Sequence, residues 1–84
     1  MKKDNQITVY STAACGYCHM LKSWLDENEL KYTEKQVDKD YDFAREMMLK
    51  SGQMGVPFTV IKDKEGNEQK ILGFDVQRLK SALL

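Results

Sequence analysis

Cys15 and Cys18 are the residues of this chain best suited to chemistry, and they are its only two cysteines. Cysteines separated by two residues can close a small disulfide ring, ligate a metal ion or anchor a haem, so the spacing leaves the chemistry open. Their context narrows it. The preceding segment, Gln6–Tyr10, alternates polar and apolar residues as a strand does, and the residues that follow show helical periodicity. Cys15 is therefore predicted to lie at the start of a helix.

A helix start favours a reactive thiol at Cys15. The first backbone N–H groups of a helix have no partner and the helix dipole is positive there, so a thiolate is stabilised and its pKa falls below the ~8.5 of a free thiol. Cys18 follows one turn later, where it can attack a mixed disulfide formed at Cys15. We expect thiol–disulfide chemistry, with a static disulfide or ordinary core cysteines as the alternative.

Three other uses of the two cysteines are weaker. His19 completes the pattern of covalent haem attachment, which requires an exported chain, and His19 is expected to face solvent instead. A zinc site needs two further ligands, and His19 is the single histidine. A [2Fe–2S] cluster needs four thiolates, hence two chains or two chains plus glutathione. We expect no bound metal, and carriage of such a cluster stays open as the alternative function.

Length and charge bound the kind of protein. A chain of 84 residues is expected to form one domain over residues 1–84. Its 13 Lys plus Arg balance its 13 Asp plus Glu, so we expect neither nucleic acid nor a membrane surface as a partner. The start of the chain, Met1–Gln6, lacks the apolar region of an export signal. These features predict a cytoplasmic monomer.

The apolar pattern predicts seven elements in the order βαβαββα. They are a strand over Gln6–Tyr10, a helix from Cys15 to about Asn28, a strand over Tyr32–Val37, a helix from within 39–42 to Ser51, strands over Phe58–Ile61 and Glu68–Leu72, and a helix capped by Asp75. Gly52 is predicted to end the second helix, and Trp24, Met20, Met47 and Met48 lie at core spacing.

This order predicts an α/β fold. A right-handed crossover makes the first two strands parallel, and the final hairpin lies antiparallel beside the first strand. The result is a four-stranded mixed sheet with helices on both faces. Cys15 then lies at the carboxyl end of a central strand, where ligand sites collect in open α/β sheets.

Three segments together resemble the glutaredoxin family of the thioredoxin superfamily: Val9–His19, which holds Cys15-Gly16-Tyr17-Cys18, then Gly55-Val56-Pro57, then Gly73-Phe74-Asp75. The resemblance covers essentially the whole chain and is closest to small glutaredoxin-like redoxins of the YruB and NrdH type. It implies a thioredoxin fold and a dithiol–disulfide oxidoreductase that reduces protein disulfides or mixed disulfides with glutathione.

The resemblance also implies roles for individual residues. Cys15 is the exposed nucleophile and Cys18 the resolving thiol. The Val56–Pro57 peptide is implied to be cis, with the Val56 backbone pairing with the substrate as an added strand. Other residues implied to line the substrate or glutathione site are Tyr17, Pro57, Gly73, Phe74 and Asp75. Tyr17 can equally be an exposed turn residue without a role, and Asp75 is expected to be a helix cap first.

Four positions depart from the family pattern or bear on glutathione. Gly16 stands where glutaredoxins usually have Pro, Thr12 where they have Lys, and Leu72 where they have the first of two glycines. Gln53 aligns with their Arg or Gln. Because Thr12 replaces the cationic Lys of the family, we expect weaker glutathione binding. We therefore expect no bound cofactor, disulfide-containing proteins as partners, and a thioredoxin-reductase-like flavoprotein as reductant, with glutathione as the alternative co-substrate.

Overall fold

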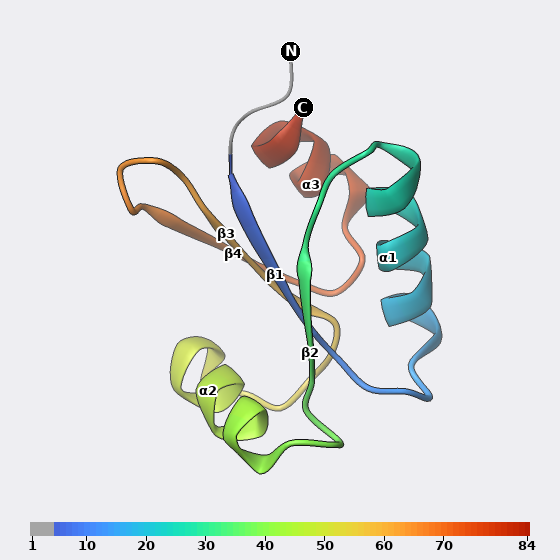
Figure 1. Ribbon diagram of the computed structural model, residues 1–84, viewed down its shortest axis with the longest axis vertical. Helices are drawn as coiled ribbons and strands as arrows, with labels where there is room; N and C mark the ends of the chain where they lie inside the picture. The colour runs from blue at the N-terminus through green and yellow to red at the C-terminus, as the bar shows by residue number, and fades with distance from the viewer. Residues whose placement is uncertain (1–4) are drawn as a thin grey trace.

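The computed structural model describes residues 5–84, which form seven elements in the predicted order (Figure 1). The strands are β1 (Gln6–Ser11), β2 (Thr33–Gln36), β3 (Phe58–Lys62) and β4 (Glu68–Leu72), and the helices are α1 (Gly16–Glu27), α2 (Tyr41–Ser51) and α3 (Val76–Leu83). The residues Met1–Asp4, on which the expectation of a missing export signal partly rests, lie outside the described residues. Between residues 5 and 84, none of the helices combines the length and apolar character that crossing a membrane requires.

The sheet has the predicted mixed topology. Its strand order is β2-β1-β3-β4, with β1 parallel to β2 and antiparallel to β3, and with β3 antiparallel to β4. The second strand is shorter than predicted because its ladder with β1 runs only from Thr33 to Gln36. As β1 has neighbours on both sides, the segment that leads to Cys15 leaves the middle of the sheet.

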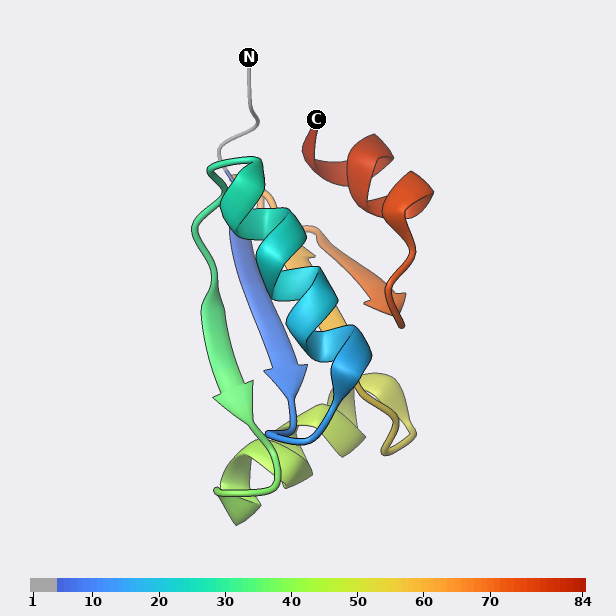
Figure 2. The same cartoon turned by 90° about the vertical axis from the view of Figure 1, so that its right-hand side faces the viewer.

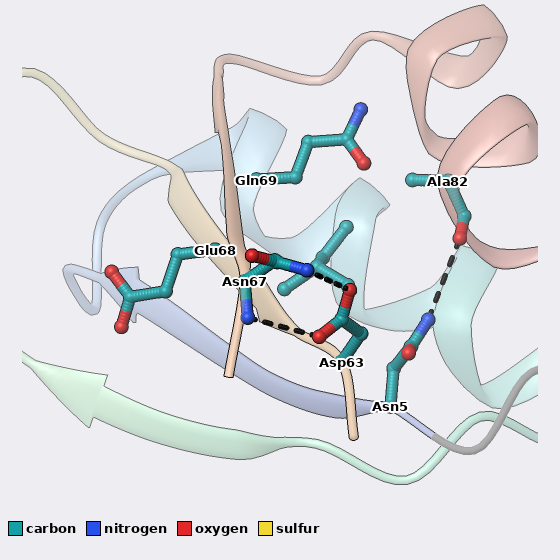
Figure 3. A pocket seen from close by; sticks show the side chains of 7 residues that line it. Asn5, Asp63, Asn67, Glu68, Gln69 and Ala82 are labelled. Atoms are coloured by element: carbon teal, nitrogen blue, oxygen red, sulfur yellow. Dashed lines mark hydrogen bonds between the residues drawn. The ribbon is translucent and has the colours of Figure 1, made fainter. Parts of the chain in front are cut away.

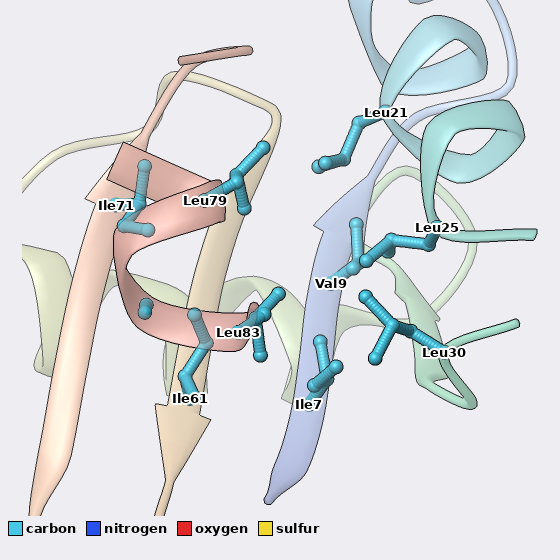
Figure 4. Close-up of a cluster of buried hydrophobic side chains, with 10 residues drawn as sticks. Ile7, Val9, Leu21, Leu25, Leu30, Ile61, Ile71, Leu79 and Leu83 are labelled. Atoms are coloured by element: carbon cyan, nitrogen blue, oxygen red, sulfur yellow. The ribbon is translucent and has the colours of Figure 1, made fainter. Parts of the chain in front are cut away.

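Helices cover both faces of the sheet, as predicted. In Figures 1 and 2, α1 and α3 lie on one face and α2 lies on the other. The larger core fills the space between the sheet and the helices α1 and α3, as Figure 4 shows. Its buried residues are Ile7, Val9, Leu21, Leu25, Leu30, Ile61, Ile71, Leu79, Ala82 and Leu83. A smaller cluster of Tyr10, Met47, Phe58 and Val60 packs beneath α2.

Two of the methionines predicted to lie in the core are exposed. Met20 keeps 51% of its surface accessible and Met48 keeps 41%. The buried stripe of α1 consists of Cys18, Leu21 and Leu25, and Met20 projects beyond its edge. On α2 only Met47 is buried, since the next residue points about 100° away around the helix. The apolar stripe predicted from the sequence is therefore wider than the helix face that is buried in the structure.

A partly buried group of polar side chains joins the end of β1 to β2 and α1. The Ser11 hydroxyl and the Lys22 ammonium each donate a hydrogen bond to the Glu34 carboxylate, both at 2.7 Å. The ammonium of Lys22, and after it the Ser11 hydroxyl, hold the pKa of Glu34 below its usual range. The charged form of Glu34 is thus the form that stabilises the fold.

A second group of polar side chains attaches α2 to the opposite face. The Lys35 ammonium donates to the Glu46 carboxylate at 2.6 Å, and the buried Tyr10 hydroxyl donates to the same oxygen. These two donors, Lys35 first, hold the pKa of Glu46 below its usual range. Burial, with the nearby carboxylate, raises the pKa of Tyr10. The tyrosine therefore stays a neutral donor at physiological pH.

A polar pocket of about 310 Å³ lies at the other end of β1 from the cysteines, between the β3–β4 hairpin and α3 (Figure 3). Asp63 accepts hydrogen bonds from the Glu65 and Asn67 N–H groups, both at 2.9 Å, and thereby closes the hairpin turn. Asn5 reaches across to the Ala82 carbonyl at 3.5 Å. Asp63 and Asn67 therefore stabilise the hairpin turn, and Asn5 fixes the chain's entry into β1.

The hydrogen bonds to the Glu34 and Glu46 carboxylates predict an acid-sensitive fold. Because the pKa values of Glu34 and Glu46 are lowered by folding, their contribution is complete above the ordinary carboxyl pKa of about 4.3 and is lost as the pH falls through the folded values. We expect the Glu34→Gln/Glu46→Gln double variant to be less stable than the parent at neutral pH and to lose less stability on acidification. Urea unfolding at neutral pH and at about pH 3 measures this.

Glu65→Gln, on the exposed hairpin turn, is the control and should follow the parent at both pH values. A double variant whose stability falls with pH as steeply as the parent's would contradict the prediction.

Candidate active site

Cys15 lies where the sequence predicted it, at the start of α1. It is the N-cap residue, in an extended conformation with φ −87° and ψ 112°, and Cys18 follows in the first turn of the helix. The two cysteines form a disulfide, and their Cα atoms are 5.2 Å apart. The spacing thus closes a disulfide ring across the first turn of α1.

The two cysteines differ in their access to solvent. Cys15 is half-buried, whereas Cys18 is fully buried against the core. The Cys15 sulfur accepts a hydrogen bond from the Cys18 backbone N–H at 3.1 Å. A hydrogen bond of this kind favours the charged form of an acceptor, so it would stabilise a Cys15 thiolate after reduction. An external sulfur can therefore reach Cys15 but not Cys18.

Strand register brings the other predicted site segments to the same end of the sheet. Tyr10 pairs with Phe58, and Phe58 pairs with Leu72. The chain segments just beyond these residues are Ser11–Cys15, 55–57 and 73–75, so they meet at the carboxyl end of β1. The Gly73 N–H donates to the Pro57 carbonyl at 2.8 Å and joins two of them directly.

The segment before β3 has the backbone form that the family resemblance implied. The Val56–Pro57 peptide is cis. Pro57 is buried, while Val56 is half-buried and packs against the smaller core cluster. Next to them, Met54 is 52% exposed, and Leu72 of β4 is 54% exposed. The rim of the site on this side is therefore apolar and accessible.

The Gln53 amide is used inside this segment, which sequence reasoning missed. Its Nε2 donates to the Ser51 hydroxyl at 3.1 Å and to the Gly55 carbonyl at 3.2 Å, and its Oε1 accepts the Gly55 N–H. Both amide protons and the amide oxygen thus have partners within 51–55. The serine and glycine that flank Gln53 at two residues' distance were the available signal, because such short spacings favour local side-chain to backbone bonds.

The remaining predicted residues divide between structural and exposed positions. Asp75 caps α3 as predicted, since its carboxylate accepts the Arg78 N–H at 3.1 Å. Phe74 is half-buried and packs against the larger core. Tyr17 is 65% exposed on the first turn of α1. Within the described residues, 5–84, no group of three or more His, Cys, Asp or Glu side chains is arranged to hold a metal ion.

The sequence profile of the glutaredoxin family matches residues 7–65, which include both cysteines and the cis-proline. The chain belongs to the glutaredoxin family. This glutaredoxin is 35% identical over 57 residues to the glutaredoxin-like protein NrdH of Lactococcus lactis subsp. cremoris, a match that covers 68% of this chain and 76% of that protein. It is accordingly a glutaredoxin-like thiol–disulfide oxidoreductase with a redox-active Cys15–Cys18 disulfide.

Two other matches set the extent of the likeness. The crystal structure of the thioredoxin-like protein BC3987 is 26% identical, with a TM-score of 0.78 over 90% of this glutaredoxin and 97% of that chain, which confirms the thioredoxin-like fold. The global transcriptional regulator Spx 2 of Bacillus anthracis is 45% identical over 31 residues. That match covers 37% of this glutaredoxin and 24% of the regulator, so the aligned segment spans about a quarter of the regulator's length.

Gly16, which replaces the family's usual proline, has room for a side chain. A Cβ atom added there meets nothing within 4 Å, and the residue begins α1 with a helical backbone. We expect Gly16→Ala to stabilise the oxidised protein by ~0.4–1 kcal/mol, because the glycine gives the unfolded chain more conformational freedom than alanine. Denaturant unfolding of the oxidised protein measures this.

Gly52→Ala is the matched comparison. It also adds a methyl group into open space, but Gly52 ends α2 at φ +71°, where alanine is strained. We expect this variant to lose ~1 kcal/mol. If both variants shift stability in the same direction, backbone conformation does not govern the effect of these glycines.

Proposed function

We propose that this glutaredoxin reduces disulfides through attack by Cys15 and resolution by Cys18. The Cys15 thiolate attacks one sulfur of the substrate disulfide, forms a mixed disulfide and releases the other sulfur as a thiolate, which takes up a proton. The Cys18 thiol then loses its proton and attacks the Cys15 sulfur, which releases the second substrate thiolate. The substrate gains two electrons, and Cys15–Cys18 is left oxidised.

One observation carries this assignment of roles. Cys15 is the half-exposed N-cap of α1 with its sulfur on a backbone N–H at 3.1 Å, whereas Cys18 is fully buried beside it. The accessible sulfur is the one that the helix start stabilises as a thiolate, and the inaccessible sulfur is within bonding distance of it. Attack therefore comes from Cys15, and only an intramolecular step uses Cys18.

The roles of the two cysteines predict which variant traps a substrate. Reduced Cys18→Ser should form a stable mixed disulfide with a disulfide-containing protein, because the resolving thiol is missing. Reduced Cys15→Ser should not, because Cys18 is shielded. Mass spectrometry after quenching measures the adduct, with the reduced parent as the control that turns over. Equal trapping by the two variants would contradict the assignment.

The accessible surface around Cys15 supports protein disulfides as the substrate class. Tyr17, Met54 and Leu72 each expose more than half of their side chains at this end of the molecule. The Val56 backbone precedes β3 at the same end of the sheet, and an extended segment of a partner can add to it as a strand, with its side chains on the apolar rim. A partner backbone and apolar side chains fit this surface better than a small, charged tripeptide does.

Glutathione finds fewer charged partners here than in a typical family member. Thr12 stands where the family has Lys, and the Gln53 amide is already hydrogen-bonded to Ser51 and Gly55. Hydrogen bonds to charged groups contribute ~1.5–3 kcal/mol each, so losing one weakens binding by roughly one to two powers of ten. We therefore propose a thioredoxin-reductase-like flavoprotein as the reductant and glutathione as a secondary co-substrate, without a bound cofactor.

Electron transfer accounts for this dithiol better than cluster carriage does. A [2Fe–2S] cluster needs four thiolates. One chain has two cysteines, and Cys18 is fully buried, so a single chain offers only Cys15 to a ligand at its surface. One chain therefore cannot complete the cluster, which would need a second chain and glutathione thiols, whereas Cys15 and Cys18 of one chain are placed to react with each other.

Recycling of the oxidised protein tests the proposed reductant. The oxidised protein is offered NADPH with either a bacterial thioredoxin reductase or glutathione and glutathione reductase, and NADPH oxidation is followed by absorbance. We expect faster turnover with thioredoxin reductase, since this enzyme needs no glutathione site. Faster turnover with glutathione would overturn the proposal.

Thr12→Lys is the paired variant for this assay. Restoring the family's cation should raise the rate with glutathione about tenfold or more, which is the effect of one charged hydrogen bond. The rate with thioredoxin reductase should stay within about twofold of the parent's, because that route does not use a contact between the introduced lysine and a carboxylate of glutathione. A variant whose glutathione rate is unchanged would show that the missing cation is not what weakens this route.

A further inference from the structure

The peptide groups on both sides of Ala13 are held by side chains from two different elements. The Ala13 N–H donates to the Asp38 carboxylate at 3.1 Å, and the Ala13 carbonyl lies 3.0 Å from Nε2 of His19. Ala13 belongs to the segment that joins β1 to α1, two residues before Cys15. Asp38 follows β2, and His19 lies in α1. A short exposed segment is thus fixed at one residue from both sides.

The direction of the His19 contact follows from the chemistry of its partner. A carbonyl oxygen can only accept, so Nε2 of His19 carries the proton. Helix geometry explains the reach: side chains of an α-helix lean toward its N-terminus, and His19 lies four residues after Cys15 on the same face. The ring therefore extends back past the first turn of α1 to Ala13, two residues before the N-cap Cys15.

The contact completes the anchoring of the segment that carries Cys15. Its beginning is held where the Val37 N–H donates to the Ser11 carbonyl at 2.9 Å. Its end is held more weakly, by a hydrogen bond of 3.4 Å that the Cys15 N–H donates to the Thr12 carbonyl. Ala13 lies between them, so its position relative to α1 decides where the Cys15 sulfur sits over the Cys18 N–H.

We propose that His19 is a positioning residue for Cys15, acting through its hydrogen bond to the Ala13 carbonyl. The bond locks the β1–α1 segment onto the first turn of the helix and keeps the Cys15 sulfur aligned with the N–H that stabilises its thiolate. Asp38 supports the same segment from the side of β2. The inference rests on the proposed role of Cys15 as nucleophile, and it requires the donor at Nε2 rather than the charge of the ring.

The test compares His19→Leu with His19→Gln in a Cys18→Ser background, where Cys15 is the only thiol. Thiolate absorbance against pH gives the pKa of Cys15, and iodoacetamide gives its reactivity. Leucine removes the donor, so the pKa should rise by about half a unit and alkylation below that pKa should slow about threefold, as expected for one lost hydrogen bond. Glutamine places an N–H donor near the same point and should restore both values.

Ser23→Leu is the control for adding an apolar side chain to this face of α1. Ser23 is exposed one turn beyond His19 and lines the same groove, about 360 Å³ in volume, between α1 and Phe74. Its substitution should leave the Cys15 pKa unchanged. Urea unfolding of each variant separates a change in alignment from a loss of stability, because a purely structural role of His19 would alter unfolding without altering the pKa.

The outcomes separate this inference from the proposed function. If His19→Leu leaves the Cys15 pKa unchanged, or if His19→Gln behaves like His19→Leu, the positioning role is overturned while the role of Cys15 stands. If the Cys18→Ser parent itself shows an ordinary thiol pKa and does not trap substrate, the proposed function fails before the variants are compared.

Discussion

The pairing of β1 on both sides is the constraint on which the rest of the structure depends. Its ladder to β2 is parallel and its ladder to β3 is antiparallel, and the two ladders overlap over Thr8–Tyr10, where β1 has a neighbour on each side. Val9 is fully buried on one face and Tyr10 is nearly so on the other, where each meets a different core cluster. A strand buried on both faces has little conformational freedom. The segment that follows it therefore begins at a fixed position.

The chemistry of the site follows from where that segment ends. Because α1 packs on the sheet through Leu21 and Leu25, its first turn is held directly above the carboxyl end of β1. Cys15 then caps the helix while Cys18 faces the core. Two chemically identical residues become unequal: one is accessible and receives an N–H, and the other is shielded. Thiol–disulfide exchange in a fixed order requires this inequality.

Polar contacts around the cysteines come from exposed or half-buried side chains rather than from the core. The Gln53 amide organises the residues before the cis-proline, and the side chains of His19 and Asp38 hold Ala13 before the nucleophile. Each of these contacts is made by a side chain within a few residues of a site segment or brought there by strand pairing. The scaffold sets the position of the segments, and these side-chain hydrogen bonds set their conformation.

The sequence by itself determined the order of elements, the mixed sheet, the start of a helix at Cys15, the cap residue Asp75, and the helix end at Gly52. These features depend on local periodicity, on caps and on the need of a left-handed helix end for glycine, all of which act within a few residues. The cis form of Val56–Pro57 was foreseen only through the family resemblance, since one proline carries no local signal for it.

The tertiary structure alone decided which apolar positions are buried and which polar side chains are already engaged. Met20 and Met48 matched a core pattern, yet they lie beyond the faces that the sheet covers. Gln53 aligns with an Arg or Gln of the family, and only the structure shows that its amide is hydrogen-bonded within its own loop. The accessibility of Cys15 against Cys18 likewise needed the packing of α1. Burial and hydrogen-bond partners depend on surfaces that meet only after residues far apart in the chain are brought together, and no local pattern encodes them.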